Sequence, residues 1–248
     1  MKYLKRFNTT PEYATYSADT ANFILPNVSL ANDAMTKVYY NQYVDPYNGH
    51  DYVEINGLKW ATMNVGATAV TDTGLYFQWG DVSGYTAAQV GSGSGQKYFG
   101  WADYKYCDGT SSNMTKYNST DGKTVLEPSD DAAHANWGGL WRMPTKDEFV
   151  SLGNAVNTAW TADYKGSGVS GLVLTDKSDS TKVLFFPAAG HCVNGSVTNV
   201  DKGGYYWSSL LDTSYMQYAY YIINSSGGAY WNNRRDRNCG FPVRPVIG

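Results

Sequence analysis

The segment from Tyr205 to Cys239 contains the side chains best suited to molecular recognition. Tyrosine offers contact area at a low cost in conformational entropy, asparagine and serine offer adaptable hydrogen bonds, and arginine pairs with carboxylates through two parallel bonds. The run from Tyr230 to Asp236 reads YWNNRRD, and its polar half is typical of an exposed loop. We therefore expect a ligand-binding surface in this part of the chain.

Part of this aromatic content has a simpler explanation. Tyr205, Tyr206, Trp207 and Tyr220 fall in stretches that read as strands. Aromatic residues are favoured in strands whatever the function of the protein. We expect these four side chains to be structural.

Side chains that could do covalent or metal chemistry are few. Three cysteines and three histidines are present, none with metal-site spacing: Cys107, Cys192, Cys239, His50, His134 and His191. The adjacent His191 and Cys192 would point to opposite faces of a strand, which is poor geometry for a nucleophile and its base. We expect no catalytic residues, no metal site and no cofactor, so the protein is not expected to be an enzyme.

An acidic cluster and one arginine have both a functional and a structural interpretation. Glu127, Asp130 and Asp131 could hold Ca²⁺, but carboxylates at this position also suit helix capping, which we favour. Arg142 could be an anion site. We favour a buried ion pair with Asp130, Asp131 or Glu148.

Composition and charge exclude several classes of partner. The net charge of −3 and the pI near 5.6 give no general attraction for nucleic acid. No apolar run approaches the roughly 20 residues of a membrane helix, and the N-terminus lacks the apolar core of a secretory signal. An odd number of cysteines argues against a disulfide framework. We expect a chain made in the cytoplasm, with no nucleic-acid partner and no membrane insertion.

Short strands and two helices must position these residues. Asn56-Gly57 predicts one hairpin turn, and KSDS (177–180) predicts another, between Gly171–Thr175 and Lys182–Phe186. Residues 66–127 read as a long irregular region. Its GSGSG run (91–95) lacks the Lys-Ser/Thr of a phosphate-binding loop. Further strands are expected over Tyr205–Ser209, Tyr218–Asn224, Gly228–Trp231 and Phe241–Val246.

Two helices have start signals. Ser129 is expected to cap a helix over Asp130–Ala135. Thr145 and Glu148 form a T-x-x-E capping box for the second helix. The apolar stripe of the second helix consists of Phe149, Leu152 and Val156.

The first 45 residues read as a separate segment. Thr10 and Pro11 predict the start of a short helix, followed by an extended stretch over Asn22–Tyr40 and a turn-rich linker, VDPYNGH (44–50). We expect residues 1–45 to serve attachment or oligomerisation and residues 46–248 to form the main domain.

Several motifs of the main domain resemble a known family. WGGLWRMPTKDEFVSL (137–152) is similar to the W-R-x-P-T-x-x-E element of the formylglycine-generating-enzyme superfamily, a branch of the C-type-lectin fold, and GFPVRPV (240–246) is similar to its closing strand. GYYWSS (204–209) and YAYYIINSS (218–226) resemble a domain of bacterial surface proteins. They also resemble the variable proteins of diversity-generating retroelements, including phage tropism determinants. With KWATMNVGA, YFQWGD and LEPSDDAAHANWGGLWRMPT, the likeness extends over most of residues 52–248.

The resemblance implies an α+β, C-type-lectin-like fold with short antiparallel strands, two helices and long irregular loops. The enzyme branch works through a cysteine pair, and neither Cys192 nor Cys239 lies in its motif. The Glu-Pro-Asn and Trp-Asn-Asp signatures of sugar-binding lectins are also absent, because Ser129 follows Glu127-Pro128 and Asn232-Asn233 follows Trp231. The resemblance therefore favours the binding branch without a calcium-dependent sugar site.

In the variable proteins of this family, a reverse transcriptase miscopies template adenines. Asn codons then change into a restricted set of residues that lacks Lys, Glu, Gln, Met and Trp. From Gly203 onward the chain contains no Lys and no Glu, which agrees with diversification of about residues 204–246. Met216, Gln217 and Trp231 cannot arise from such codons and would be fixed or templated differently.

Matched to the family, the C-terminal region separates into scaffold and surface. The constant scaffold would be Ala219, Tyr220, Arg237, Gly240, Phe241, Val243, Arg244 and Pro245. The exposed, ligand-binding set would be Asp212, Tyr215, Tyr218, Tyr221, Ile223, Tyr230, Trp231, Asn233, Arg234, Arg235, Asp236 and Cys239. Strand alternation is expected to send Tyr220 and Ile222 inward and Tyr221 and Ile223 outward.

The resemblance implies a receptor-binding protein, a phage tail-tip component that binds a bacterial surface protein or glycan. Such a protein would be made without a signal peptide, released by lysis and associated with the virion. A trimer is suggested by analogy with tail-tip proteins. The alternative is a non-diversified bacterial domain of the same fold that serves adhesion or structure.

Overall fold

The computed structural model describes residues 3–5, 13–15 and 47–248. The chain divides into two compact units, Met1–Tyr43 and Val44–Gly248. In the first unit, β1 (Tyr3–Lys5) pairs antiparallel with β2 (Tyr13–Thr15). The helix start expected at residues 10–11 and the extended stretch expected over 22–40 lie outside the described residues.

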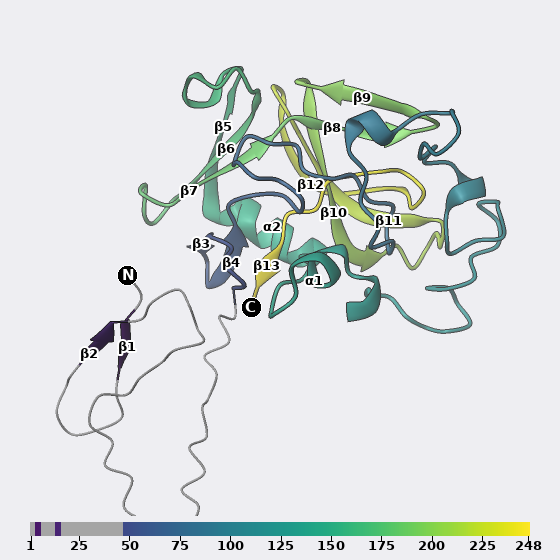
Figure 1. Ribbon diagram of the computed structural model, residues 1–248, viewed down its shortest axis with the longest axis horizontal. Coiled ribbons are helices and arrows are strands. Elements are labelled where there is room, and N and C mark those ends of the chain that lie inside the picture. The colour runs from purple at the N-terminus through teal and green to yellow at the C-terminus, as the bar shows by residue number, and fades with distance from the viewer. Residues whose placement is uncertain (1–2, 6–12, 16–46) are drawn as a thin grey trace, which may run out of the picture. The chain divides into compact units, whose positions relative to one another are not determined.

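The second unit is an α+β structure built on a five-stranded sheet (Figure 1). The strands lie in the order β12-β11-β10-β8-β9. Their bounds are β8 (Ala189–Val193), β9 (Ser196–Val200), β10 (Gly203–Leu211), β11 (Tyr218–Ser225) and β12 (Gly228–Asp236). β8 and β10 are parallel, and the other neighbours are antiparallel. The predicted α+β class is thus confirmed, and β12 and β9 are the edges of this sheet.

Two three-stranded sheets complete the second unit, in the orders β13-β4-β3 and β5-β6-β7. Their strands are β3 (Tyr52–Ile55), β4 (Leu58–Ala61), β5 (Val156–Thr161), β6 (Gly171–Asp176), β7 (Val183–Pro187) and β13 (Val246–Ile247). Both predicted hairpins are confirmed. Asn56 and Gly57 have φ of 51° and 78°, values that an Asn-Gly turn accepts easily.

The prediction of a closing strand over Phe241–Val246 is wrong. Phe241 makes one isolated bridge, to Phe77, and regular pairing begins only at Val246, opposite Trp60. Pro242 and Pro245 lack the amide hydrogen that a ladder requires, so this stretch cannot form a continuous strand.

The helices are α1 (Ala132–Trp137) and α2 (Lys146–Ala155). The capping box of α2 is confirmed, because the Glu148 amide donates to Thr145 Oγ1 (3.2 Å) and the Thr145 amide donates to Glu148 Oε2 (2.7 Å). Ser129 was expected to cap the first helix, and this is wrong. Asp131 caps α1 by accepting from two backbone amides at 2.9 and 3.0 Å, while Ser129 lies in a preceding 3₁₀ turn.

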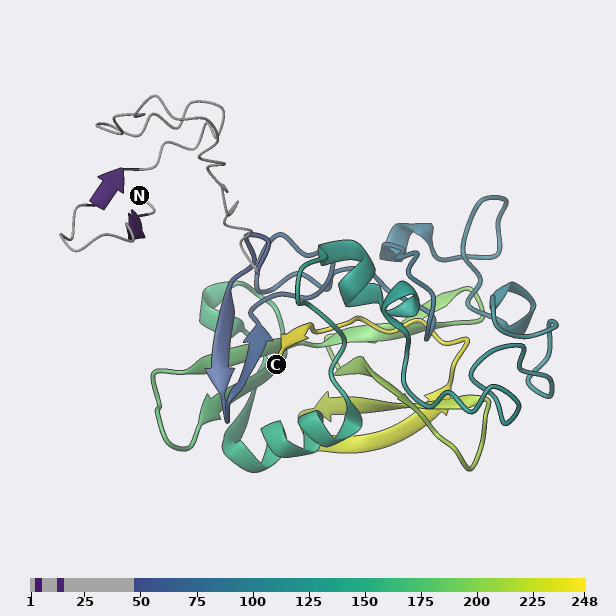
Figure 2. The same cartoon turned by 90° about the horizontal axis from the view of Figure 1, so that it is seen from below.

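The five-stranded sheet has an apolar core on each face. On one face, Tyr206 and Ile222 pack with Phe149 and Leu152 of α2. Figure 2 shows α2 against this side of the sheet, beside β12. The other face packs under the irregular region and the C-terminal stretch 237–245, in a cluster that includes Trp79, Trp141, Trp207, Tyr221 and Phe241. Since both faces are covered, strand alternation alone does not decide which side chains reach solvent.

Residues 66–127 are irregular, as expected. They contain the short 3₁₀ turns Ala87–Gln89 and Trp101–Asp103 and several isolated bridges; two further 3₁₀ turns, Pro128–Asp130 and Tyr164–Gly166, lie later in the chain. Arg237, fully buried directly after β12, holds this region to the sheet. Its guanidinium donates to the Tyr104 hydroxyl and to backbone carbonyls of Lys116, Tyr117 and Met216, at 2.7 to 3.1 Å.

Candidate ligand-binding surface

Five side chains form a row straight across the five-stranded sheet. Tyr230 of β12 lies opposite Ile223 of β11, which lies opposite Tyr205 of β10. The Gly204–Gly190 pairing places Tyr205 beside His191 of β8, and His191 lies opposite Thr198 of β9. With neighbouring strands about 4.8 Å apart, this row spans about 19 Å on one face of the sheet. We call these five residues the aromatic row.

The aromatic row is open at one end and closed toward the other. The Tyr230 side chain is 63% exposed at the β12 edge, Ile223 and Tyr205 are half-buried, and His191 is buried. The His191 and Tyr205 rings lie 4.4 Å apart, and Asn199 Nδ2 donates to the Tyr205 hydroxyl at 2.9 Å. Burial, helped by the charge of Arg235, lowers the pKa of His191 to about 4, so the imidazole is neutral at pH 7.

Tyr221 and Cys239 were expected to be exposed, and both expectations are wrong. Tyr221 is 9% exposed, because its ring packs against those of Phe241 and Trp207, with ring centres 4.9 and 6.1 Å apart. Cys239 is 1% exposed and contacts the Arg235 guanidinium. Burial raises the pKa of Cys239 to about 11, which keeps the thiol protonated and unreactive.

The register also corrects the predicted faces of β11. Tyr221 and Ile223 do share a face, but that face belongs to the Trp207 and Phe241 core. Ile222 is buried as expected. Tyr220 is half-exposed with the Lys146 ammonium 4.9 Å from its ring centre, so it is not the inward residue that alternation suggested.

A second group of the expected residues lies at the β10–β11 turn and the end of β12. Asp212 is buried, not exposed as expected, because its carboxylate accepts from Arg234 Nη1 (3.0 Å) and from the Ser214 amide (2.9 Å). The Arg234 guanidinium also lies 5.1 Å from the ring centre of Tyr215, which is 50% exposed, and Tyr218 lies beside Tyr215. We call Asp212, Tyr215, Tyr218 and Arg234 the turn cluster.

The expected polar loop of residues 232–236 is instead part of β12, so this expectation is wrong. Residues 233–236 pair with residues 221–218 of β11. Asn232 lies in a β-bulge, because Tyr221 and Ile223 oppose Asn233 and Tyr230. Polar side chains are compatible with a strand at the edge of a sheet, where one side of the ladder meets solvent.

Trp231 and Asp236 are both partly buried by neighbouring parts of the fold. Trp231 is half-buried against α2, and a Cβ added to Gly153 would lie only 2.5 Å from its indole nitrogen. Asp236 is half-buried opposite Tyr218, and burial raises the pKa of its carboxyl. Neither of these side chains offers a ligand the full exposure that the sequence suggested.

The structure therefore divides the expected binding set between the two faces of the sheet. Ile223, Tyr230, Asn233 and Arg235 lie on the side of the aromatic row, whereas Arg234 lies on the α2 side. A single small ligand cannot contact both groups. The binding set predicted from the sequence did not include His191, Thr198 or Asn199, and Tyr205 was expected to be structural. No local signal identifies these four, because the parallel pairing of β8 with β10 brings them to the row.

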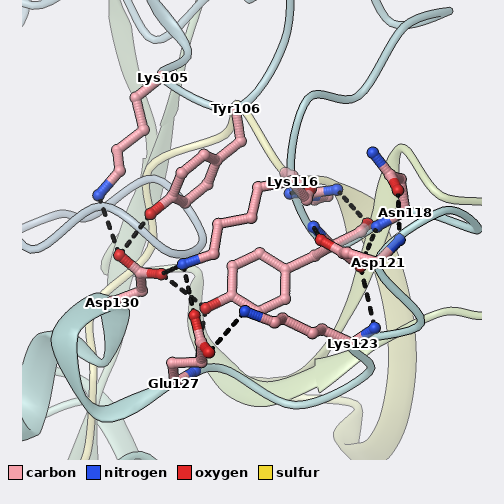
Figure 3. Close-up of polar contacts among 10 residues, drawn as sticks. Lys105, Tyr106, Lys116, Asn118, Asp121, Lys123, Glu127 and Asp130 are labelled. Carbon is pink, nitrogen blue, oxygen red and sulfur yellow. Dashed lines mark hydrogen bonds and ion pairs between the residues drawn. The ribbon is translucent and has the colours of Figure 1, made fainter.

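The acidic cluster considered for Ca²⁺ is occupied by basic and phenolic groups (Figure 3). The Asp130 carboxylate accepts from Lys116 Nζ (2.5 Å), Tyr117 Oη (2.6 Å), Lys105 Nζ (3.3 Å) and Tyr106 Oη. Burial alone would raise the pKa of Asp130, but the bonds from Lys116, Tyr106 and Tyr117 outweigh it and hold the pKa well below its usual range. These contacts join the irregular region to the turn before α1.

The remaining acidic and basic candidates also have structural partners. Glu127 pairs with Lys116 and Lys123, each at 2.6 Å. Arg142 forms two parallel bonds with Glu148, at 2.8 and 2.5 Å, which confirms one of its three expected partners; the pair is half-buried. Across residues 47–248, no group of three or more His, Cys, Asp or Glu side chains is arranged to hold a metal ion.

Two hollows lie away from the aromatic row. They measure about 610 and 280 Å³ and are lined by the β3–β4 turn, α2 and the chain end. None of the residues expected to bind a ligand lines either hollow. No helix among the described residues is long and apolar enough to cross a bilayer.

Comparison with known families adds one match. A family model described as a domain of unknown function (DUF8237) matches residues 174–246, a range that runs from within β6 to the first residue of β13 and includes β10, β11 and β12. No curated protein and no solved structure matches the chain. The match thus covers the whole aromatic row and the turn cluster without assigning either a function.

Proposed function

We propose that this protein is a non-catalytic receptor-binding protein, a virion-associated phage tail-tip component that recognises a bacterial surface protein or glycan. In this proposal, the binding surface is the open end of the aromatic row together with Asn233 and Arg235. The resemblance to retroelement variable proteins of the C-type-lectin fold motivates the assignment, and diversification of about residues 204–246 is part of the same proposal.

One observation carries the proposal, namely the 63% exposure of Tyr230 on a strand that is otherwise fixed. β12 is paired along β11, Trp231 packs against α2, and Arg237 is buried directly after the strand. Tyr230 and Arg235 are therefore exposed on a rigid backbone. Rigid aromatic and arginine side chains lose little conformational entropy on binding, and they dominate the energy of many interfaces.

The experiment measures binding of the fluorescently labelled full chain to a panel of bacterial isolates by flow cytometry. Tyr230→Ala and Arg235→Ala should each weaken binding to a responsive isolate by about tenfold or more, as expected for central interface residues. Arg234 is left unchanged, because its removal would leave the buried Asp212 carboxylate without its partner. Absence of binding to every isolate would contradict the proposal.

The matched control is Tyr52→Ala, which removes a tyrosine that is 37% exposed on β3, in a different sheet. It should leave cell binding unchanged. All three variants should melt within about 3 °C of the parent chain, since surface substitutions change stability little. A large loss of stability in Tyr230→Ala would instead mean that this tyrosine is part of the scaffold.

Diversification has its own test. The genome that encodes the chain should contain a near-identical repeat of the C-terminal coding segment, with adenines at the variable codons, beside a reverse-transcriptase gene. If neither is present, the protein is the non-diversified adhesion or structural domain, and only the binding part of the proposal remains.

A further inference from the structure

Arg235 differs from Arg234 and Arg142 in forming no ion pair with a carboxylate among the described residues. Arg234 pairs with Asp212, and Arg142 pairs with Glu148. Within residues 47–248, Arg235 makes no ion pair; its guanidinium contacts the Cys239 thiol, which is protonated. The adjacent Asp236 carboxylate interacts electrostatically with Arg235 but lies on the other face of β12, opposite Tyr218. Arg235 is therefore a positive group outside any ion pair of the described residues, on a protein whose net charge is −3.

The position of Arg235 places its charge beside the aromatic row. It lies on the same face of β12 as Tyr230 and Asn233, opposite Ala219. Burial lowers the pKa of His191 and raises that of Tyr221, and the charge of Arg235 acts to lower the pKa at both sites. Together with the contact between the guanidinium and the Cys239 thiol, these effects place the charge of Arg235 over the sheet, on the side of Tyr221 and His191.

The neighbouring row on the same face leaves the tyrosine rings uncovered. It consists of Gly228, Ser225 and Gly203, which pair with one another across β12, β11 and β10. The Tyr205 ring lies over Gly203, since a Cβ added there would meet the ring at 3.4 Å. Because these residues are small, no side chain of this row stands between the tyrosines and a ligand approaching from that side.

We propose that the open end of the aromatic row binds a sugar that carries a carboxylate group, with Tyr230 and Tyr205 against the sugar ring and Arg235 on the carboxylate. This rests on the proposed receptor-binding function and specifies its ligand class. A tyrosine ring packs against the C–H face of a sugar through its apolar body. A guanidinium binds a carboxylate through two parallel charge-assisted bonds. The Asn233 amide supplies further donors and an acceptor for hydroxyl groups.

An acidic sugar suits this surface better than an acidic peptide. Protein partners are held by a well-packed, desolvated apolar centre. Here the only fully apolar side chain of the row is Ile223, which is half-buried. The other groups at the open end are phenol, amide and guanidinium, each with both a flat surface and hydrogen-bonding atoms.

The test titrates the full chain with small sugars and follows binding by saturation-transfer NMR. The probes are N-acetylneuraminic acid and the methyl glycosides of glucuronic and galacturonic acid, each uronide compared with methyl glucoside or methyl galactoside. At least one acidic sugar should bind about tenfold more tightly than the neutral sugars, as one charge-assisted pair predicts. Binding should weaken as salt rises, because an exposed ion pair is screened.

Arg235→Gln should abolish the preference for the acidic sugar. Tyr230→Ala should weaken the binding of acidic and neutral sugars alike. Lys165→Gln is the matched control, because it removes one positive charge from an exposed position in the β5–β6 connection. It should leave the preference unchanged.

Equal binding of acidic and neutral sugars, or a preference that survives Arg235→Gln, would overturn the inference. Tighter binding of a tri-glutamate peptide than of any acidic sugar would overturn it in favour of a protein ligand. If the chain binds bacterial cells but no acidic sugar competes, the inference fails while the receptor-binding function stands. If no cells are bound either, both fail.

Discussion

Replacing Arg237 with Met should destabilise the main unit by about 3 kcal/mol. The guanidinium is fully buried and donates to three backbone carbonyls, those of Lys116, Tyr117 and Met216. Methionine fills part of the space but donates no hydrogen bond. Each buried carbonyl left without a donor costs about 1 kcal/mol at the low end of the usual range, which gives about 3 kcal/mol for the three.

Two further effects of this change oppose each other. The guanidinium carbon lies 4.8 Å from the Trp79 ring centre, and losing that cation–π contact adds about 1 kcal/mol to the cost. Arg237 has no carboxylate partner among the described residues, so removing its buried charge recovers a similar amount of desolvation energy. The net expectation therefore stays near 3 kcal/mol.

Urea unfolding measures this cost, with the midpoint falling at an unchanged m-value. For a unit of this size the melting temperature should fall by about 6 to 12 °C. The matched control is Arg235→Met at the exposed neighbouring arginine, which should change the free energy of unfolding by less than about 0.5 kcal/mol. A cost below about 1 kcal/mol for Arg237→Met would refute the argument that these carbonyls depend on Arg237.

Three further changes test the scaffold. The pKa of Asp130 is depressed in the fold, so its carboxylate stabilises the protein above about pH 4, and this contribution is lost as the pH falls further. Asp130→Asn should therefore destabilise the protein at pH 7. In melting curves recorded at different pH values, the variant should lose less of its melting temperature below about pH 4 than the parent chain does. Asp131→Ala should cost about 1 to 2 kcal/mol in urea unfolding through loss of the helix cap, whereas Ser129→Ala should be close to neutral. Gly153→Ala should destabilise the protein by about 1 to 3 kcal/mol, because the new methyl group meets the Trp231 indole. Helix propensity alone would predict stabilisation by about 1 kcal/mol, so a rise in melting temperature would contradict that packing.

Local signals in the sequence predicted local structure well. The Asn56-Gly57 hairpin and the Thr145 capping box depend on residues within four positions of each other, and both formed as expected. Ser129 failed as a cap because Pro128 begins a 3₁₀ turn that moves the helix start two residues onward, to Asp131. Local propensity could not decide between two capping residues this close together.

The candidate site was harder to predict, because it depends on pairing between distant segments. Tyr221 is buried by Phe241, which lies 20 residues further along, and nothing within β11 indicates that cover. The bulge in β12 changes the alternation between Tyr230 and Asn233, so the face of each arginine could not be counted from the strand start. His191 joins the row only through a parallel pairing that has no turn signal.

The way in which β12 is held has a consequence for protein engineering. Trp231 and Arg237 fix the strand through contacts that do not involve Tyr230, Asn233 or Arg235. A combinatorial library varied at these last three positions should therefore retain the backbone, and its members should differ in the chemistry they display on one common frame. The domain could then serve as a display scaffold for selecting new binders, with β12 as the randomised strand.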